Sequence, residues 1–320
     1  MNIICGLGHI PERASRPCVL TIGVFDGVHR GHRFVLEKVV AEAAQRRVKS
    51  AVVTFSVHPS HILARAEKTP HVMSLKHKLH YIAEAGIQAC YVLDFNRSLA
   101  AVSASSFVEN ILLKRLGMVS LYVGEDFVFG RRAEGDVDFL VREAAEKKFS
   151  LHVVKPLRLG GTIVSSTCVR QAIRSGNLKL AQKYLGRPVG LMGRVIHGEG
   201  RGRKLGFPTA NISAEHEVLV PDGVYAAWAL SGGRVFPAAA YLGSKRTFHK
   251  KHHHKYIEVF VLNSRRDFYD KIMEIRFVQK IRSDQTFPDT DSLIRQIRQD
   301  TEKVKNILSA LPQPAAILPF

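Results

Sequence analysis

Residues 18–32 read Cys-Val-Leu-Thr-Ile-Gly-Val-Phe-Asp-Gly-Val-His-Arg-Gly-His, and a helical pattern follows them. The first five residues form the short apolar run that is typical of a buried strand. Glycines at positions 23, 27 and 31 let the backbone approach a ligand closely. The N-terminus of the next helix offers unpaired N–H groups and the positive end of a dipole. The stretch therefore predicts a strand, a glycine-rich turn and a helix that together suit an anionic group.

The rest of the first half repeats this alternation of short strands and longer helices. Apolar, β-branched runs predict strands at 18–22, 50–55, 89–93, 120–123 and 150–154. Helical spacing predicts helices near 33–46, 75–85, 105–116 and 137–147. Gly86, Gly117 and Gly176 come soon after helical segments, where a C-terminal cap needs a positive φ. The pattern predicts an α/β domain with a doubly wound parallel sheet.

The second half has a different sequence pattern, which begins after Leu-Gly-Arg-Pro at 185–188. Apolar runs lie near 189–195, 223–230, 235–242, 256–262 and 272–277, without helices between them. Strands without crossover helices predict a small antiparallel β-barrel or sheet. A final helix is expected at 290–309, and an irregular tail with three prolines at 311–320. We expect two domains, 1–186 and 187–320.

Composition narrows the class of protein. At roughly 150 residues per domain, 320 residues suggest two domains, and 46% hydrophobic residues exclude disorder as the main state. The longest apolar runs fall far short of the ~20 residues that span a bilayer, and the N-terminus lacks a signal pattern. Four cysteines, Cys5, Cys18, Cys90 and Cys168, form no C-x-x-C pair, which argues against disulfides and a cysteine zinc site. We expect an unexported, cytoplasmic chain.

The charge balance points to an anionic partner. The sequence has 47 Lys and Arg against 28 Asp and Glu, a net charge of +19. Such an excess is typical of nucleic-acid binding, but a solvated basic surface or an enzyme that handles several phosphate groups gives the same total. Composition alone leaves these three interpretations open.

Four motifs of the first half occur in a recognisable order. After G-x-F-D-G-x-H-x-G-H at 23–32 come Thr-Phe-Ser-Val-His-Pro at 54–59, Gly-Glu-Asp-Phe-Val-Phe-Gly at 124–130 and Val-Ser-Ser-Thr-Cys-Val-Arg at 164–170. Together they resemble the adenylyltransferase module of the bifunctional prokaryotic riboflavin kinase/FAD synthetase family. The resemblance implies a Rossmann-like nucleotidylyltransferase domain. In its reaction, the FMN phosphate attacks the α-phosphorus of ATP and expels pyrophosphate.

The resemblance also implies roles for individual residues. His29 and His32 hold the ATP phosphates, and Ser166, Thr167 and Arg170 grip the β- and γ-phosphates; the two histidines and the arginine count as catalytic. The remaining residues expected at the ATP site are Gly23, Phe25, Asp26, Gly27, Gly31 and Ser165. Those expected on the flavin side are Asp126, Phe127 and Phe129, with His58 and Pro59 as a secondary site. The residues alone leave other interpretations open, namely core packing for the two phenylalanines, a helix cap for Ser-Ser-Thr, and a turn at His58-Pro59.

The second half opens with a glycine-rich basic loop. Residues 197–211 read His-Gly-Glu-Gly-Arg-Gly-Arg-Lys-Leu-Gly-Phe-Pro-Thr-Ala-Asn. A flexible cationic loop suits a polyphosphate, although alone such a run is more often a solvated loop or a nucleic-acid contact. Its end resembles the G-F-P-T-A-N signature of the riboflavin kinase module, a small barrel with a C-terminal helix. The resemblance implies that Gly198, Arg203 and Gly206 lie at the nucleotide.

Two alternating polar residues follow in this loop, Thr209 and Asn211. Their oxygens can face the same way along an extended segment and share a hard cation. The resemblance assigns them to Mg²⁺ that bridges the nucleotide phosphates. Glu258 aligns with the family's catalytic glutamate, which accepts the proton of the riboflavin 5′-hydroxyl. Without the resemblance Glu258 is an outward-facing strand residue; Arg282 and Phe287 resemble the segment near the flavin.

The chain departs from the family pattern in this half. Where the family has N-x-G-x-x-P-T-F, residues 241–248 read Tyr-Leu-Gly-Ser-Lys-Arg-Thr-Phe. The basic run at 245–255 includes four histidines, and we expect it to assist nucleotide capture; a solvated loop and a histidine metal site are the alternatives. Asp270 replaces a glycine, and Asp tolerates a left-handed conformation better than most residues.

The sequence therefore predicts a bifunctional enzyme that phosphorylates riboflavin to FMN and adenylylates FMN to FAD. Its expected ligands are riboflavin, FMN, FAD, ATP and Mg²⁺. No nucleic-acid or membrane partner is expected, and a homo-oligomer is compatible with the sequence. Two alternatives remain, an FAD synthetase with a non-catalytic flavin-binding barrel and a basic nucleic-acid-binding protein.

Overall fold

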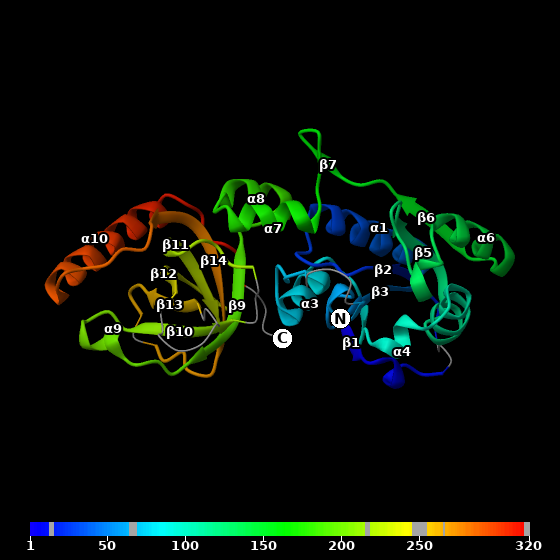
Figure 1. Ribbon diagram of the computed structural model, residues 1–320, viewed down its shortest axis with the longest axis horizontal. Coiled ribbons are helices and arrows are strands. Elements are labelled where there is room, and N and C mark those ends of the chain that lie inside the picture. The colour runs from blue at the N-terminus through cyan, green and yellow to red at the C-terminus, as the bar shows by residue number, and fades with distance from the viewer. Residues whose placement is uncertain (13–15, 64–68, 215–217, 245–254, 265, 317–320) are drawn as a thin grey trace. The chain divides into compact units, whose positions relative to one another are not determined.

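The computed structural model describes residues 1–12, 16–63, 69–214, 218–244, 255–264 and 266–316. Its contacts divide the chain into two compact units (Figure 1). The first consists of Met1–His71 and Leu75–Ser166, and the second of Val72–Ser74 and Thr167–Phe320. The predicted functional boundary at 187 stays a prediction.

A six-stranded parallel sheet forms the centre of the first unit. Its order is β1-β4-β3-β2-β5-β6. The chain runs from β2 through β3 to β4 on one side and then returns to β5 on the other. The carboxyl ends of β2 and β5 therefore meet where the strand order reverses, the usual ligand position in such sheets. The strands are β1 (Asn2–Cys5), β2 (Cys18–Ile22), β3 (Lys49–Phe55), β4 (Ala89–Leu93), β5 (Met118–Gly124) and β6 (Ser150–Val154).

Helices cover both faces of this sheet, which confirms the predicted fold class. On one face, Leu20 and Leu121 pack against Phe107, Leu112 and Leu140 of the helices η2 and α6. α1 packs against β2 and β3, and all five side chains of β2 are buried. Two-sided burial explains why β2 reads as a continuous apolar run. The larger helices are α1 (Arg30–Arg46), α3 (Leu75–Glu84), the short α5 (Ala104–Ser106) that continues as the π-helix η2 (Phe107–Arg115), and α6 (Val137–Lys147).

Several short elements were not predicted. β1 is an edge strand with mostly exposed side chains, so it carries no apolar signal. The helix expected at 33–46 begins three residues earlier because the His29 side chain caps it, accepting the His32 backbone N–H. The helix expected at 105–116 is mostly π-helix. The other unpredicted elements of this unit are η1 (Leu7–His9), α2 (Ser60–Leu63), α4 (Arg97–Ala100), η3 (Arg131–Ala133) and the hairpin β7 (Arg158–Leu159) and β8 (Thr162–Ile163).

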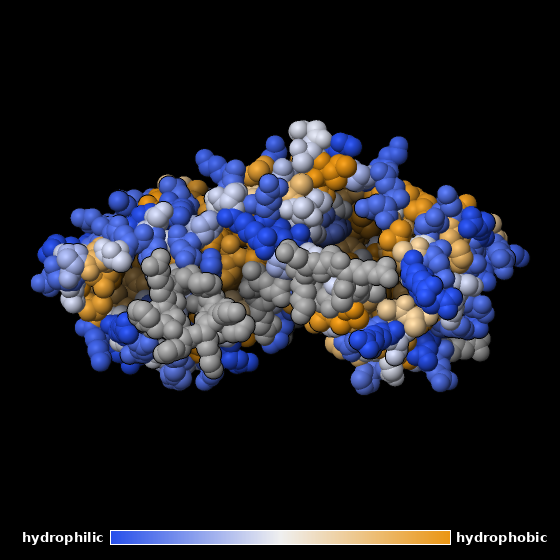
Figure 2. Space-filling view, in the orientation of Figure 1, coloured by the Kyte–Doolittle hydropathy of each residue, from blue (hydrophilic) through white to orange (hydrophobic). Residues whose placement is uncertain are grey.

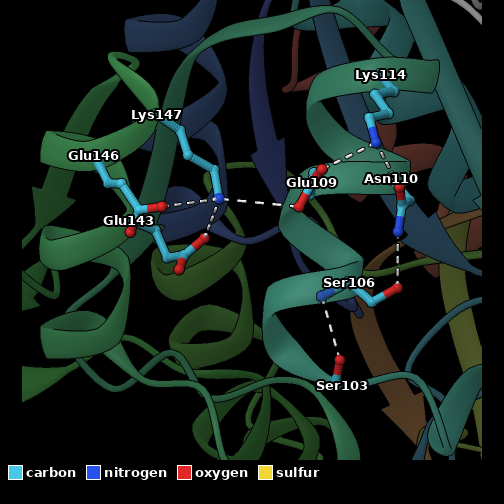
Figure 3. A network of polar contacts seen from close by, with 8 residues as sticks. All are labelled: Ser103, Ser106, Glu109, Asn110, Lys114, Glu143, Glu146 and Lys147. Atoms are coloured by element: carbon cyan, nitrogen blue, oxygen red, sulfur yellow. Dashed lines mark hydrogen bonds and ion pairs between the residues drawn. The ribbon is translucent and has the colours of Figure 1, made fainter.

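Charged side chains connect η2 with α6 (Figure 3). Lys147 Nζ lies 3.9 Å from Glu109 on η2, 3.7 Å from Glu143 and 3.5 Å from Glu146. Lys114 donates to Glu109 from the next turn at 2.9 Å. Lys147 and Glu143 are partly buried, whereas Lys114 is exposed, so the network joins η2 to α6 close to solvent and adds little stability.

A closed antiparallel barrel forms the second unit, in the order β10-β13-β12-β11-β14-β9. This confirms the predicted barrel with a terminal helix. β11 is buried on both sides, because Trp228 and Leu230 share a core cluster with Val304 and Leu308 of α10. The elements are α7 (Ser166–Arg174), α8 (Leu178–Leu185), β9 (Gly190–Ile196), α9 (Arg201–Lys204), β10 (Thr209–Ala214), β11 (Gly223–Ser231), β12 (Arg234–Ser244), β13 (Lys255–Val261), β14 (Ile272–Arg282) and α10 (Thr290–Ser309).

Local backbone predictions are confirmed at four positions. Gly86, Gly117 and Gly176 have φ values of 90°, 65° and 74°, and Asp270 has φ 60°. The basic loop predicted to be flexible contains the single-turn helix α9, with Gly206 at φ 86° after it. β10 was expected only as an extended segment.

Figure 2 shows one face of each unit, on which hydrophilic residues predominate and hydrophobic residues form smaller groups. Within the described ranges no helix is long and apolar enough to cross a membrane. All four cysteines are free thiols. Burial raises the pKa of Cys18 and of Cys90 to about 12, so both stay protonated at neutral pH.

Barrel closure depends on one small residue, Gly193. It pairs with Ala214 of β10 and with Met273 of β14. A Cβ at this position would overlap the Ser213 carbonyl and the Ile212 side chain. Gly193 is therefore needed where β9 joins both ends of the barrel.

We predict that Gly193→Ala lowers the free energy of unfolding of the barrel by about 1–3 kcal/mol, as overpacking does elsewhere. Differential scanning calorimetry measures this as a lower transition temperature. Gly8→Ala is the control, because nothing lies within 4 Å of a Cβ at that position. Equal transition temperatures for the two variants would contradict the prediction.

Candidate functional site

The turn between β2 and α1 has an unusual backbone. Phe25 and Val28 have positive φ values of 51° and 36°. A β-branched residue in this region is a genuine outlier, and such residues cost about 1–3 kcal/mol each unless their surroundings impose the conformation. Both side chains are buried, as are Asp26 and His29. The turn is a rigid, strained structure rather than a flexible loop.

His29 and His32 lie together at the N-terminus of α1. Their rings stack with centroids 3.6 Å apart, and His32 also contacts the edge of Phe25 at 5.1 Å. His29 Nδ1 accepts the His32 backbone N–H at 3.3 Å, so a neutral His29 carries its proton on Nε2. A Cβ on Gly31 would lie 3.2 Å from the His29 ring. The two predicted histidines thus form a donor pair at a helix dipole end.

Three of the predicted motifs line one cavity of about 680 Å³ beyond β2 and β5. Gly23, Phe25 and His32 line one side, and Asp126 with Phe127 lines the other. The cavity also takes in two further predicted residues, Pro59 and Phe129. Lining residues that sequence reasoning missed include Phe55, Phe95, Leu99, Val102 and Arg132. Phe55 belongs to the 54–59 motif but was given no role, and the other four lie in short helices or in the loops beside them, which carry no motif.

Phe127 and Phe129 fit both interpretations that the sequence allowed. Their rings stack with centroids 5.4 Å apart and pack against the core cluster of the first unit. Both also line the cavity. His58, by contrast, directs Nδ1 to the hydroxyl of Ser60 at 2.8 Å, a contact typical of a turn.

The 164–170 motif leads into α7. Ser166, the first residue of this helix, donates its hydroxyl to the Asp26 carbonyl at 2.9 Å and so ties the motif to the β2–α1 turn. Ser165 precedes the helix, and Thr167 and Arg170 belong to the second compact unit. The roles of these three residues stay predictions.

A second site lies on the barrel around Glu258. Glu258 in β13 pairs with Asn211 of β10 and with Tyr241 of β12. Thr209 Oγ1 donates to Glu258 Oε2 at 3.2 Å. Thr209 and Asn211 of β10 thus lie beside Glu258 of β13, although Thr209 precedes Glu258 by 49 positions in the sequence.

Two cavities meet at Glu258 and Thr209. The larger, about 890 Å³, is lined by the loop from His197 to Gly202 and by Asn211. The smaller, about 410 Å³, is lined by Tyr241, Arg282 and Phe287 and by apolar residues of α10. A carboxylate between a glycine-rich basic cavity and a ring-lined cavity can accept a proton from one ligand as it attacks the other.

Neighbouring contacts fix the side chains of the smaller cavity. Arg282 Nε donates to Asp300 at 2.8 Å, and its guanidinium lies 5.6 Å from the centre of the Phe287 ring. Tyr241 donates its hydroxyl to Asp284 at 3.2 Å. Burial, with the negative charge of Asp284, raises the pKa of Tyr241 to about 12, so it stays a neutral donor.

The basic residues of the loop divide between cavities. Arg201 lines both cavities at Glu258, whereas Arg203 lines a neighbouring one of about 390 Å³ with Tyr269. Of the predicted capture loop at 245–255, Lys255 lies in the larger cavity and 2.9 Å from Asp222. Residues 245–254, with Arg246 and the histidine run, lie outside the described residues.

The oxygen donors of this site fit a hard cation. Thr209 and Asn211 lie on one face of β10 beside the Glu258 carboxylate. Mg²⁺ prefers such oxygens and usually takes one or two from the protein besides waters and phosphates. In the part of the chain that is described, no group of three His, Cys, Asp or Glu residues could hold a metal, so these oxygens are the site's candidates.

A glycine-rich turn with stacked histidines on a parallel sheet and a glutamate between two barrel cavities are together typical of a two-module, nucleotide-dependent transferase. Residues 12–168 match the FAD synthetase family, and residues 185–308 match the riboflavin kinase family. The chain belongs to the bifunctional riboflavin kinase/FMN adenylyltransferase family.

Relatives cover almost the whole chain. The bifunctional riboflavin kinase/FMN adenylyltransferase of Escherichia coli K12 is 36% identical over 94% of this chain and 96% of its own length. That of Pseudomonas fluorescens is 35% identical over 99% of both chains. A crystal structure described as a macrolide-efflux protein from Streptococcus pneumoniae superimposes with a TM-score of 0.83 at 27% identity. It covers 96% of this chain and 99% of its own, so the fold is shared throughout.

We predict that Gly198→Ala slows riboflavin phosphorylation about 10–100-fold, the usual cost of disturbing the support of a metal ligand, which is the role expected of Asn211. A Cβ on Gly198 would overlap the Asn211 side-chain amide, which would have to move away from Thr209. Steady-state FMN formation measures the effect, and Asn211→Ala should reproduce it. Conversion of added FMN to FAD is the internal control; an unchanged FMN rate would contradict the prediction.

Proposed function

We propose that the two activities of this bifunctional enzyme divide between residues 187–320, which phosphorylate riboflavin, and residues 1–186, which adenylylate FMN. The observation that carries the first assignment is Glu258 between two cavities with Thr209 bonded to it. The second assignment rests on His29 and His32, whose rings stack at the N-terminus of α1. The matches to the two families, at 185–308 and 12–168, support this division.

In the adenylylation site, the chain's main task is to position two anions. The His29 Nε2–H, His32 and the N-terminus of α1 donate toward the ATP phosphates, where negative charge grows as pyrophosphate leaves. Ser165, Ser166, Thr167 and Arg170 hold the β- and γ-phosphates. Phe127 and Phe129 offer a stacked apolar wall for the flavin, with Asp126 beside them. No covalent step on the protein is needed.

In the kinase site, Glu258 accepts the proton of the riboflavin 5′-hydroxyl as that oxygen attacks the γ-phosphorus. The flavin lies in the smaller cavity against Phe287 and Arg282, and the nucleotide lies in the larger one, along the 197–202 loop. Thr209 and Asn211 would hold Mg²⁺, which neutralises charge on the β- and γ-phosphates when bound. Arg201, which reaches both cavities, adds positive charge where the phosphoryl group passes.

The proposal extends to partners and compartment. Phosphate groups of ATP and FMN are the anionic partners of the +19 charge, so no nucleic acid or membrane partner is invoked. Mg²⁺ is the metal, and the cytoplasm, where riboflavin and ATP meet, is the compartment. In the described residues both sites are built from one copy of the chain, and a homo-oligomer is compatible with them.

Incubation with riboflavin, ATP and Mg²⁺ tests the proposal, and Glu258→Gln is the decisive variant. The amide keeps the shape of the carboxylate but cannot accept a proton, so FMN formation should fall roughly 10²–10⁴-fold. The variant should still convert added FMN to FAD at the normal rate. Chromatography separates the flavins. A wild-type protein that makes FAD from added FMN but no FMN from riboflavin would instead have a non-catalytic barrel.

The reciprocal prediction concerns His29→Ala and His32→Ala. Each variant loses a preorganised donor to a phosphate, which should reduce FAD formation about 10²–10³-fold. The rate of FMN formation should stay within about twofold of the wild-type rate, because the kinase site lies in the other unit. His9→Ala, an exposed histidine of the same unit, is the control. Equal loss of both products would contradict a division of the two activities.

A further inference from the structure

Lys78 is a buried lysine that neither proposed reaction uses. It lies on α3 with 5% of its surface exposed. Its Nζ donates to the backbone carbonyls of Phe55 at 2.8 Å and Val24 at 3.1 Å. Lysine is seldom buried unless its ammonium finds partners, because removing the charge from water is costly. Burial lowers the pKa of Lys78 to about 8, and the nearby Asp26 carboxylate opposes the shift.

The two carbonyls belong to the walls of the adenylylation cavity. Val24 is the second residue of the β2–α1 turn, and Phe55 is the last residue of β3; both line the 680 Å³ cavity. The Val24 carbonyl also accepts the Thr54 hydroxyl at 3.1 Å. The Lys78 ammonium and the Thr54 hydroxyl therefore both donate to the Val24 carbonyl oxygen of the turn. The Lys78 ammonium also donates to the Phe55 carbonyl at the end of β3.

This anchor adjoins the strained part of the turn. Phe25, next to Val24, has φ 51°, and Val28, directly before His29, has φ 36°. Such conformations persist where the surroundings fix them. Since Phe25 contacts His32 and His29 stacks on His32, a turn that relaxed at residues 24–28 would move both imidazoles.

We infer that Lys78, with Thr54 as its partner on the Val24 carbonyl, is a positioning residue for adenylyl transfer. It holds the 23–29 turn in the conformation that aims His29 and His32 at the phosphates. The inference rests on the proposed assignment of the ATP phosphates to these histidines. Lys78 itself acts through the backbone and donates no proton to the reaction.

The test compares Lys78→Gln and Lys78→Met in the full chain. A misplacement of catalytic groups by about 1 Å costs on the order of 10² in rate. We therefore expect kcat for FAD formation from added FMN to fall about 10²-fold in the Met variant, with a smaller change in KM for ATP. The Gln variant keeps two N–H donors and should be less impaired. FMN formation from riboflavin should remain at the wild-type rate.

Lys76→Met is the matched control, because Lys76 lies two positions earlier on α3 and is exposed. Circular dichroism and thermal melting check that each variant is folded at the assay temperature. Thr54→Val is isosteric and removes the second donor to the same carbonyl; kcat for FAD formation should fall about 3–10-fold, as for one misaligned contact. If the Lys78 variants do not fold, the Thr54→Val variant provides the test of the inference.

A wild-type kcat for FAD formation in folded Lys78 variants would overturn the inference. If the Lys78 variants fail to fold, a wild-type kcat in the Thr54→Val variant would overturn it. A loss confined to KM would also overturn it, because a misaimed histidine pair must affect the transition state. Failure of the proposed function looks different. In that case His29→Ala and His32→Ala themselves retain FAD formation, whatever the Lys78 variants do.

Discussion

The first unit depends on a backbone conformation that its own residues disfavour. A parallel sheet that reverses its strand order leaves a crevice beyond β2 and β5, and the β2–α1 turn must enter it closely enough to present N–H groups. The turn does so with left-handed Phe25 and Val28. Buried polar contacts from Thr54, Lys78 and Ser166 to its carbonyls keep that conformation. The conformation of the turn therefore depends on side chains that lie outside the turn itself.

The barrel meets the same chemical need by a different physical route. Here the loop that we propose to face the phosphates contains glycines at 198, 200 and 202. The strand register sets Asn211 and Tyr241 on either side of Glu258. Gly198 leaves room for Asn211, and a Cβ on Gly202 would overlap the Phe207 carbonyl. In the proposed assignment two unrelated folds hold the same polyphosphate, so the function would belong to the sites rather than to the architecture.

The sequence predicted the elements whose burial is periodic or complete. The bounds of β2, β4, β6, α6 and α10 agree with those expected, because their apolar residues contact the core on one or both faces. β1 was missed because an exposed edge strand has no such pattern. Gly23, Phe25 and His32 line the predicted cavity, whereas Asp26, Gly27 and His29 do not, and their roles stay predictions. Arg203 lies in a different cavity from Glu258, two positions beyond Arg201 in the short helix α9. Lys78 carries no local signal, because a lysine in a helix is normally exposed.

The barrel's departures from the family pattern can be judged from packing. Tyr241 replaces an asparagine of the family beside Glu258, and a larger side chain there needs space. Gly243 supplies that space, because any Cβ at 243 would overlap the Tyr241 ring and hydroxyl. The hydroxyl then reaches Asp284 in the segment after β14, and Glu258 keeps its bond to Thr209. Tyr241 therefore forms part of the wall of the smaller cavity, while Glu258 keeps its register with Asn211. That arrangement favours an active kinase over a barrel that only binds flavin.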